Sequence, residues 1–458
     1  MNSEQFTVNS GGGGAGAPRL PCLRVVLIAT YEMGRQPFGL ASPAAWLRRA
    51  GCEVAIFDTA RQKLDAQALH DADLIGLYLP MHTATRLALR LIPQVRKMAP
   101  RAQLCAFGLY APLMAALLRA AGVAAIFGGE FEAGLVSLAL GRDTPPADPK
   151  IPRLDFLVPD RAGLPPLEQY AQLHLPDGGR RVVGYTEATR GCKHICRHCP
   201  IVPIYGGQFR AVPVEVVLAD IRQQVAAGAR HITFGDPDFL NGPTHALRIT
   251  EALHREFPHL SFDATIKVEH LLQHAALLPR LRERGCVLIT SAVESFDDAV
   301  LERLDKGHTA ADFTQALELT RAAGLALNPT FVSFTPWTTP AGFAAMLTAL
   351  AAHGLVEQVA PVQYGIRLLL PPGSPLLDLE EARQWLGGFD PEALSYRWHG
   401  PADELCAGVQ ALVAQATKQD QPRAAIFEAV ANLVGGVRRP PAAMPRATVP
   451  YLDEPWFC

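Results

Sequence analysis

Short apolar runs alternate with amphipathic segments along the first third of the chain. Runs that are apolar throughout are typical of strands covered on both faces of a parallel sheet. The segments between them repeat apolar positions at helical spacing. This alternation predicts a doubly wound, flavodoxin-like α/β domain that binds ligands at the carboxyl ends of its strands. The expected strands are 23–29, 54–57, 72–79, 103–107 and 124–127, and the expected helices include 42–49 and 87–98.

The same alternation returns after a proline-rich stretch, now in six strand–helix units. Such repeats build a barrel whose chemistry lies at the carboxyl ends of the strands. The expected strands are 182–189, 229–234, 261–268, 286–293, 325–334 and 361–370, and the helices after the first five are 214–227, 244–256, 271–284, 297–304 and 311–323.

These patterns divide the chain into five parts. Residues 1–21 are polar and glycine-rich and are expected to be a disordered lead, before an α/β domain over 22–142. Residues 143–181 are rich in proline and predict a linker. A barrel over 182–375 follows, and then a helical extension and tail over 376–458 with helices at 380–386, 403–418 and 423–434. The apolar faces of these last helices are expected to cover the open side of the barrel.

Composition narrows the class of protein. Hydrophobic residues make up 49% and charged residues 19%, as in an ordinary globular interior. A net charge of -2 argues against nucleic acid or an anionic membrane as the main partner. No apolar run approaches the roughly 20 residues of a membrane helix, and the start lacks the apolar core of a signal peptide. Nine cysteines, three of them clustered, favour a reducing cytoplasm over a disulfide framework.

The clustered cysteines are Cys192, Cys196 and Cys199, in a C-x3-C-x2-C array between Gly191 and Pro200. The glycine allows a tight entry and the proline stiffens the exit, so a loop can wrap the thiolates around one metal centre. Structural zinc usually takes four ligands from two separated pairs, and the chain has no second C-x2-C pair. Three cysteines on a four-iron cluster would leave one iron open. A structural zinc or iron–sulfur loop is the alternative.

The other cysteines and the two histidines of the loop are not expected to bind the metal. The cysteines outside the array, apart from the terminal one, sit in apolar or helical runs and are expected to be small core residues. These are Cys22, Cys52, Cys105, Cys286 and Cys406. His194 and His198 lie within the loop and are expected beside the ligands or at the surface.

The cysteine spacing resembles that of radical S-adenosylmethionine (SAM) enzymes, whose partial (β/α)6 barrel also fits the six units. Five further sequence segments resemble the radical SAM family named for its CUAEP or CCAEP tail. These segments are 31–39, 203–207, 234–243, 291–295 and 334–338. The resemblance implies a [4Fe–4S] cluster on Cys192, Cys196 and Cys199, with SAM on the open iron. In the tail, Glu454 and Pro455 match.

The two chalcogen positions of that tail hold Tyr451 and Leu452 here, although the terminal Cys458 offers a thiol in their place. We expect Cys458, on a proline-stiffened strap, to reach into the barrel. A loose end whose aromatic residues lie on the barrel rim is the alternative.

The first domain resembles the cobalamin-binding domain that precedes many radical SAM domains, through its element order and its Gly128–Glu132 ending. The D-x-H-x-x-G motif, whose histidine ligates cobalt in one class of these domains, is absent. The resemblance therefore leaves cobalamin open as a third cofactor, bound without a histidine ligand. A purely structural sheet is the alternative.

Polar residues at the barrel strand ends are candidates for binding SAM. Asp236 and Asp238 follow one strand and are placed to accept hydrogen bonds from the SAM ammonium group, or else to form a turn or cap. Glu294 and Ser295 resemble the family's pair near SAM, with capping of the next helix as the alternative for Ser295.

Two cations, Lys267 and Arg367, lie at barrel strand positions. A buried cation is costly unless it meets an anion, so a carboxylate of SAM or of substrate is the expected partner. The sequence singles out no catalytic residue beyond these cofactor contacts.

Taken together, the resemblance implies a cytoplasmic, oxygen-sensitive enzyme that cleaves SAM reductively and modifies a small molecule. It also implies an electron donor such as flavodoxin or ferredoxin, and neither nucleic acid nor membrane as a partner. Cleavage to a 5′-deoxyadenosyl radical, with or without methyl transfer through cobalamin, is one outcome. Transfer of the 3-amino-3-carboxypropyl group of SAM, for example to arsenic, is another, and a non-enzymatic iron–sulfur redox or metal sensor is the third.

Overall fold

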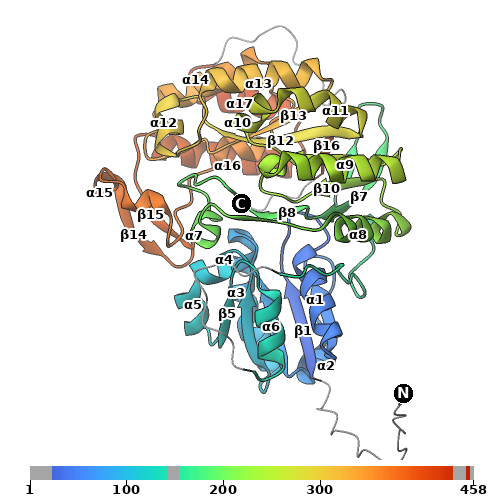
Figure 1. Ribbon diagram of the computed structural model, residues 1–458. Coiled ribbons are helices and arrows are strands. Elements are labelled where there is room, and N and C mark those ends of the chain that lie inside the picture. The colour runs from blue at the N-terminus through green and yellow to red at the C-terminus, as the bar shows by residue number, and fades with distance from the viewer. Residues whose placement is uncertain (1–22, 143–153, 437–449, 454–458) are drawn as a thin grey trace, which may run out of the picture.

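The computed structural model describes residues 23–142, 154–436 and 450–453. A smaller α/β domain and a larger barrel domain pack against each other, and the segment from β8 to α7 runs between them (Figure 1). Among the described residues, no helix combines the length and the apolar character that crossing a bilayer requires.

The first domain is the predicted doubly wound sheet. Its five strands are all parallel, in the order β2-β1-β3-β4-β5, with an apolar core on each face. The strands are β1 (Arg24–Ala29), β2 (Glu53–Asp58), β3 (Leu74–Tyr78), β4 (Gln103–Phe107) and β5 (Ala125–Phe127). The helices are α1 (Phe38–Arg49), α2 (Ala66–His70), α3 (His82–Met98), α4 (Tyr110–Leu113), α5 (Ala115–Ala120) and α6 (Glu132–Ala139).

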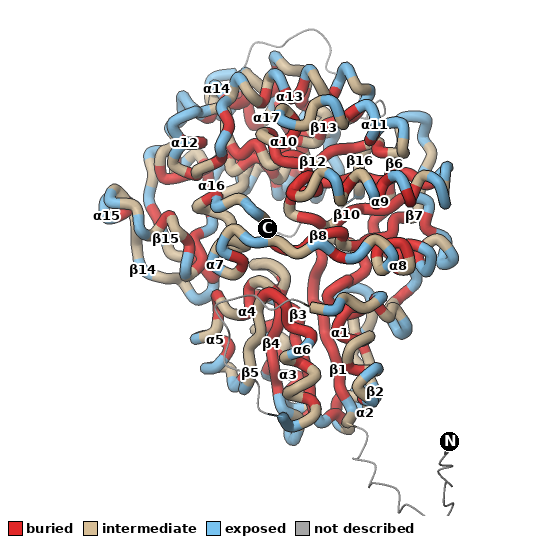
Figure 2. Tube along the Cα trace, viewed as in Figure 1, coloured by how far each residue is buried: buried red, intermediate tan, exposed pale blue. Residues whose placement is uncertain are grey.

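The barrel domain is a curled sheet of seven strands in the order β13-β12-β11-β10-β7-β6-β16. The five strands from β7 to β13 in this order are parallel, and helices cover their outer face, so the strands are buried on both sides (Figures 1 and 2). These strands are β7 (Arg180–Thr186), β10 (His231–Phe234), β11 (Ser261–Thr265), β12 (Cys286–Glu294) and β13 (Ala326–Phe331). The covering helices are α8 (Val214–Ala226), α9 (Pro243–Glu256), α10 (Val268–Gln273), α11 (Leu278–Glu283), α12 (Asp298–Arg303), α13 (Ala310–Ala322) and α14 (Pro340–Ala352).

The sixth strand predicted over 361–370 is almost absent. A short 3-10 helix, η4 (Pro361–Gly365), takes its first half, because Pro361 has no N–H to donate to a sheet ladder. Only a parallel bridge between Phe334 and Arg367 joins this segment to the chain after β13. The barrel therefore stays partly open, as its resemblance implies.

Two short strands extend the sheet where the sequence predicts none. β6 (Gln172–His174) falls in the expected linker and pairs antiparallel with β7. β16 (Tyr451–Leu452), from the tail, pairs antiparallel with β6. Strands this short carry too few residues for an alternating pattern to show. The barrel domain thus begins before residue 182, inside the stretch that was predicted to be linker.

The C-terminal extension is not wholly helical. A hairpin of β14 (Leu386–Asp390) and β15 (Ser395–Trp398) follows the short α15 (Ala382–Trp385). Helices α16 (Asp403–Lys418) and α17 (Arg423–Asn432) then pack against η4, where they cover the weak sixth position of the barrel as predicted.

Candidate functional site

The three clustered cysteines lie on a loop between β8 (Thr189–Gly191) and α7 (Val202–Tyr205), just beyond the carboxyl end of β7. β8 pairs with β9 (Phe209–Ala211), which ties both ends of the segment together. Gly191 has a φ of 74°, and a Cβ atom there would clash with the ring of Tyr205 and the carbonyl of Gln208. A glycine is therefore required where the loop begins.

Residues from the end of β10 brace this loop. Asp236 accepts hydrogen bonds from the backbone N–H of Ala188 (3.0 Å) and the hydroxyl of Thr189 (2.5 Å). Asn241 accepts from the N–H of Lys193 at 3.2 Å. Burial raises the pKa of Asp236 to about 6. Because both of its oxygens hold the loop, the predicted contact of Asp236 with the SAM ammonium stays a prediction.

The three cysteines of the loop lie close together. Burial raises the pKa of Cys199 to about 12, and the neighbouring Cys196 and Cys192 act in the same direction, so the three thiols face one another. Burial also raises the pKa of Cys192, and a bound metal centre would favour the thiolate forms.

A buried cation, Lys306, stands beside the cysteines, and the sequence alone does not single it out. Its ammonium group donates to Glu294 at 3.2 Å, and His198 lies 3.0 Å from the same carboxylate oxygen. Burial acts to lower the pKa of Lys306, but Glu294 and the thiolates of Cys196 and Cys199 raise it. Lys306 therefore stays charged and favours an anionic centre on the loop.

Glu294 owes its position to a local distortion at the end of β12. Its φ is 70°, which is uncommon outside glycine, and the register with β13 shifts between Ala292 and Glu294. Burial acts to raise its pKa, but Lys306 and His198 lower the pKa of Glu294 to about 2. The carboxylate is therefore ionised and turned towards the cysteine loop.

Of the predicted SAM contacts, Asp238 and Lys267 also reach the loop. Asp238 Oδ2 lies 3.4 Å from His194 Nε2 and 2.6 Å from His270 Nδ1. The Lys267 ammonium lies 3.1 Å from His194 Nδ1 and 3.1 Å from Glu269. Both residues therefore gather around His194, which lies beside the cysteines as the sequence predicts.

Ser295 and Arg367 are oriented differently. The cap of α12 is Asp297, whose carboxylate accepts from the N–H of Ala299 at 2.9 Å, so the prediction that Ser295 caps this helix is wrong. Ser295 accepts from the N–H of Asp297 instead. Arg367 donates to Asp403 at 2.8 Å and stacks on Trp398. Its carboxylate partner is thus Asp403 of the C-terminal extension, and the expected contact with a carboxylate of SAM or of substrate stays a prediction.

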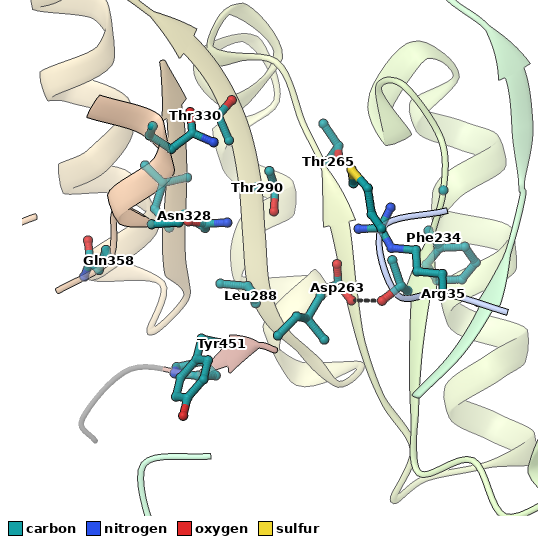
Figure 3. A pocket seen from close by; sticks show the side chains of 18 of the residues that line it. Arg35, Phe234, Asp263, Thr265, Leu288, Thr290, Asn328, Thr330, Gln358 and Tyr451 are labelled. Carbon is teal, nitrogen blue, oxygen red and sulfur yellow. Dashed lines mark hydrogen bonds between the residues drawn. The ribbon is translucent and has the colours of Figure 1, made fainter. Parts of the chain in front are cut away.

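The barrel encloses a polar cavity of about 210 Å³ (Figure 3). Asp263 is its central charged side chain and accepts from His231 Nε2 (2.8 Å) and from the hydroxyl of Thr233 (2.6 Å). Arg35 enters from the loop after β1, and Tyr451 enters from the tail, so both domains and the chain's end contribute to the wall. Other polar lining residues are Thr265, Thr290, Asn328, Thr330 and Gln363.

The tail is fixed where it passes the barrel. The ring of Tyr451 stacks on His174 at 4.7 Å between centroids, and His174 also pairs with Asp453 at 3.0 Å. The predicted return of the tail to the barrel is therefore seen for the residues up to Asp453. Glu454, Pro455 and Cys458 lie outside the described residues, and the role expected of Cys458 stays a prediction.

Between the two domains, one arginine is held by three carboxylates. Arg190, two residues before the first cysteine, lies 3.1 Å from Glu130, 2.7 Å from Glu132 and 2.8 Å from Glu187. All are buried or nearly so, and burial raises the pKa of Glu187 to about 7 even though Arg190 lowers it. The Gly128–Glu132 string thus attaches the first domain to the cysteine loop.

The cavity beside this arginine, at the carboxyl ends of β3 and β4, tests the fit of cobalamin. It measures about 220 Å³ and is lined by Tyr78, Phe131, Tyr185 and Arg190 among others. Drug-sized ligands fill roughly 300–1,000 Å³, and a corrin with its tail is larger than these. A corrin would therefore enter this cavity only after these side chains move, and cobalamin binding stays a prediction.

The remaining cysteine predictions are confirmed for the described residues. Cys52, Cys105, Cys286 and Cys406 are buried, and none of the described cysteines forms a disulfide. Cys22 lies outside the described residues.

Comparison with known proteins supports the reading of the loop. Residues 186–335 match the model of the Radical SAM superfamily. Among curated proteins, tRNA-2-methylthio-N(6)-dimethylallyladenosine synthase of Hahella chejuensis is 24% identical over 262 residues, covering 51% of this chain and 52% of that protein. The same enzyme of Chlorobium phaeobacteroides is 28% identical over 141 residues, covering 29% and 31%. The chain thus spans about a third to a half of the length of these relatives.

Two solved structures share the fold over most of the chain. The methyltransferase TsrM of Kitasatospora setae, with tryptophan and a SAM analogue bound, gives a TM-score of 0.65 at 19% identity and covers 86% of this chain and 88% of its own. The cobalamin-dependent enzyme OxsB, with aqua-cobalamin and SAM bound, gives 0.67 at 15% identity and covers 87% and 67%. Residues 186–335 therefore form a domain of the Radical SAM superfamily, and this domain implies a [4Fe–4S] cluster and SAM as cofactors.

Proposed function

We propose that the protein cleaves SAM reductively at the loop of Cys192, Cys196 and Cys199 and uses the product on a small polar molecule in the barrel cavity. The observation that carries this proposal is the juxtaposition of three facing cysteines with buried, charged Lys306 at the carboxyl end of the barrel sheet. A bound cluster supplies the single electron that breaks a carbon–sulfur bond of SAM.

The residues around the loop prepare the site for that chemistry. Asp236 and Asn241 fix the start of the loop, while the N–H of Arg197 donates to the carbonyl of Leu304 and fixes its middle. Lys306 offsets the negative charge of thiolate ligands in a buried setting, where an uncompensated charge is costly. A rigid, charge-balanced loop holds a cofactor in one orientation, which is the main contribution of a protein to cofactor chemistry.

SAM carries an ammonium and a carboxylate group, and the strand ends offer an opposite charge for each. We assign the ammonium to the ionised Glu294 and the carboxylate to Lys267, since both side chains end barrel strands and approach the cysteine loop. Asp238 and Asp236 have other partners in the structure, and Ser295 and Arg367 face elsewhere, so we place these four outside the immediate SAM contacts.

The barrel cavity indicates the class of substrate. Threonine, asparagine and glutamine side chains provide both donors and acceptors, and the cavity also holds charges of both signs, from Asp263 and Glu357 and from Arg35 and Arg423. The net charge of -2 argues against a tRNA substrate, even though the curated relatives carry a tRNA-modifying name. We propose a small polar substrate with an amine or hydroxyl group that binds Asp263, and reduction by a flavodoxin- or ferredoxin-type donor.

Two finer assignments belong to the same proposal. The strings shared with the CUAEP/CCAEP-tail family, including 234–243 and the Glu454–Pro455 pair, support membership of that family. The first domain, whose inter-domain cavity is small, supports a role in holding the loop through Arg190. Cobalamin binding would require Tyr78 and its neighbours to move, although the solved structures of TsrM and OxsB show it in proteins of this fold.

Product analysis tests the proposal. The anaerobically reconstituted protein is mixed with SAM and dithionite, and the products are separated by liquid chromatography with mass detection. We expect 5′-deoxyadenosine and methionine. Formation of 5′-methylthioadenosine would instead show release of the 3-amino-3-carboxypropyl group. Cys196→Ser is the control without a cluster, and a fully loaded protein that leaves SAM intact would contradict the proposal and favour a sensor.

A further inference from the structure

Three side chains from separate elements meet next to the cysteine loop. They are His194 of the loop, Asp238 after β10, and His270 of α10. One potential metal-ligand atom of each lies within 4.8 Å of the other two. Their side chains are 13%, 1% and 0% exposed. Such a buried gathering of two imidazoles and one carboxylate needs a physical reason, because burying polar groups is costly.

Hydrogen bonding does not provide that reason. His270 Nδ1 lies only 2.6 Å from Asp238 Oδ2, and His194 Nε2 lies 3.4 Å from the same oxygen. None of these three atoms completes a hydrogen bond, and the two contacts become ion pairs only when an imidazole is protonated. Buried polar atoms in proteins nearly always have a partner. The other oxygen of Asp238 is already engaged, by the N–H groups of Leu240 (3.2 Å) and Lys267 (3.4 Å).

We propose that His194, Asp238 and His270 bind one divalent transition-metal ion, such as Zn²⁺ or Fe²⁺, separate from the iron–sulfur cluster. Two histidines and one carboxylate form a known ligand set for such ions, and water completes the coordination. An ion placed among the three atoms would coordinate each of them in place of the hydrogen bond that it lacks. The proposal uses none of the cysteines and does not rest on the function proposed above.

The surroundings of His194 suit a metal ligand. Its other ring nitrogen, Nδ1, lies 3.6 Å from Glu269, and a carboxylate in this place accepts the N–H of a metal-bound imidazole. The Lys267 ammonium, at 3.1 Å from both Nδ1 and Glu269, stays paired with Glu269 when Nδ1 carries a proton.

The site has a structural consequence for the loop. An ion there would join the cysteine loop, through His194, to the end of β10 and to the start of α10. These elements come from sequence positions far apart, and α10 begins directly after Lys267. We therefore infer that the ion is a positioning element, which holds the cysteine loop against the barrel without taking part in electron transfer.

Metal analysis of the full-length protein tests the site. The cluster-loaded protein is incubated anaerobically with Zn²⁺ or Co²⁺, desalted, and analysed by plasma emission together with its iron and sulfide. We expect about one added ion per chain, and a Co²⁺ spectrum with ligand-field bands but without thiolate charge-transfer bands. His270→Ala and Asp238→Asn should each lower the affinity for the ion by at least about tenfold.

His274→Ala is the matched control, because His274 is a half-exposed neighbour of the His270 ring, 5.5 Å away between centroids. This variant should keep the ion. Equal ion content in the wild-type protein and His270→Ala, no added ion in the wild-type protein, or thiolate bands in the Co²⁺ spectrum would each overturn the proposal. Iron and sulfide content reports on the cluster separately, so loss of the cluster cannot be mistaken for loss of this ion.

Discussion

Replacing Glu294 by glutamine should destabilise the barrel strongly while preserving the shape of the side chain. In the structure, one oxygen of Glu294 lies 3.0 Å from His198 and 3.2 Å from the Lys306 ammonium, and all three groups are largely buried. Glutamine removes the negative charge and leaves Lys306 as a buried cation without a counter-ion. Breaking a buried pair in this way typically costs about 3–5 kcal/mol.

The lowered pKa of Glu294 gives a similar estimate of how much its charge stabilises the folded state. Lys306 and His198, acting against burial, lower it from the ordinary 4.5 to about 2. At about 1.36 kcal/mol per pH unit, this difference corresponds to about 3.4 kcal/mol of stability. Because the folded-state pKa is lowered, the contribution is complete above about pH 4.5 and is lost as the pH falls towards 2. Wild-type and Glu294→Gln stabilities should therefore converge on acidification through this range.

Urea unfolding of the cluster-free chain, followed by circular dichroism under reducing conditions, measures the free energy of unfolding of the barrel. We expect Glu294→Gln to lower it by about 3 kcal/mol at pH 7. The double variant Glu294→Gln/Lys306→Met should lose clearly less than the two single variants added together, since it leaves no unpaired charge. Glu381→Gln, in the half-exposed pair with Arg303, is the control and should cost at most about 1 kcal/mol. A Glu294→Gln effect as small as this control, or strict additivity, would refute the reasoning.

Four further outcomes are expected. Cys196→Ser should reduce iron and sulfide after reconstitution to near zero, because three ligands leave no spare. Burial lowers the pKa of His308 to about 4, so the folded state resists protonation and the wild-type protein should become less stable as the pH falls from 6.5 to 4. In urea unfolding, His308→Gln should not show this decrease. Deleting 451–458 should speed hydrogen exchange in 172–174, which loses β16 but keeps β7 as a strand partner, while iron content and SAM affinity stay unchanged. Tyr78→Ala should retain more hydroxocobalamin through gel filtration than the wild-type protein, because it enlarges the inter-domain cavity.

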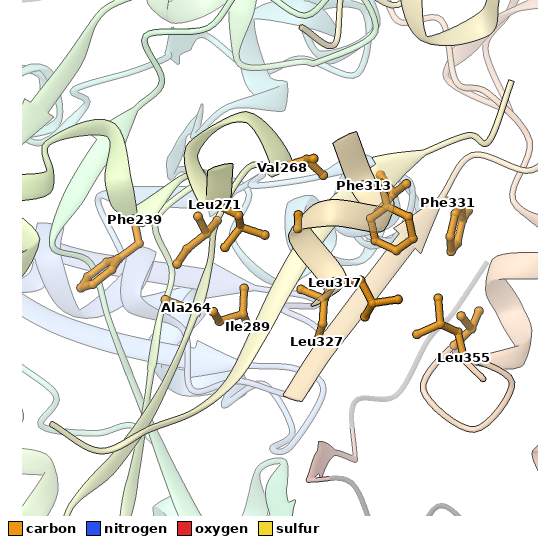
Figure 4. Close-up of a cluster of buried hydrophobic side chains, with 14 of the residues drawn as sticks. Phe239, Ala264, Val268, Leu271, Ile289, Phe313, Leu317, Leu327, Phe331 and Leu355 are labelled. Atoms are coloured by element: carbon orange, nitrogen blue, oxygen red, sulfur yellow. The ribbon is translucent and has the colours of Figure 1, made fainter. Parts of the chain in front are cut away.

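The elements that the sequence predicts well are those with a strong period and clear ends. Helix α16 is found at the predicted residues 403–418, and β4 at 103–107. Apolar residues of the barrel strands meet those of the covering helices in one continuous core, where Ile289 and Leu327 lie near Leu271 and Leu317 (Figure 4). Such a core enforces the pattern that the sequence displays.

The elements that the sequence does not predict are those that depend on a partner distant in the chain. β6 and β16 are both short; β6 pairs with β7, and β16 becomes a strand by pairing with β6 across nearly 280 residues. The expected sixth strand fails at Pro361, where helices α16 and α17 take over the covering role. Neither outcome follows from local periodicity, because each depends on a partner that only the folded chain brings close.

The residues of the candidate site also fall into those that local sequence predicts and those that only the fold brings together. Spacing alone identifies Cys192, Cys196 and Cys199, because ligands on one loop must be close in sequence. Lys306 sits more than a hundred residues after these cysteines, and His270 lies 76 residues after His194. Their meeting depends on the order of strands in the sheet. The only local hint was a run of polar residues after strands, which also describes ordinary turns and caps.

Arg190 shows why the first domain belongs to the site whether or not it holds a third cofactor. The residue stands one position before Gly191 and two before Cys192, so its backbone has little freedom relative to the cysteines. Its guanidinium is held by Glu130 and Glu132 of the first domain, in a buried setting where loss of one partner is expensive. A shift of the first domain would therefore pull on the start of the cysteine loop. Because the Arg35 side chain of the same domain also lines the barrel cavity, the position of this domain sets both the cofactor loop and the substrate space.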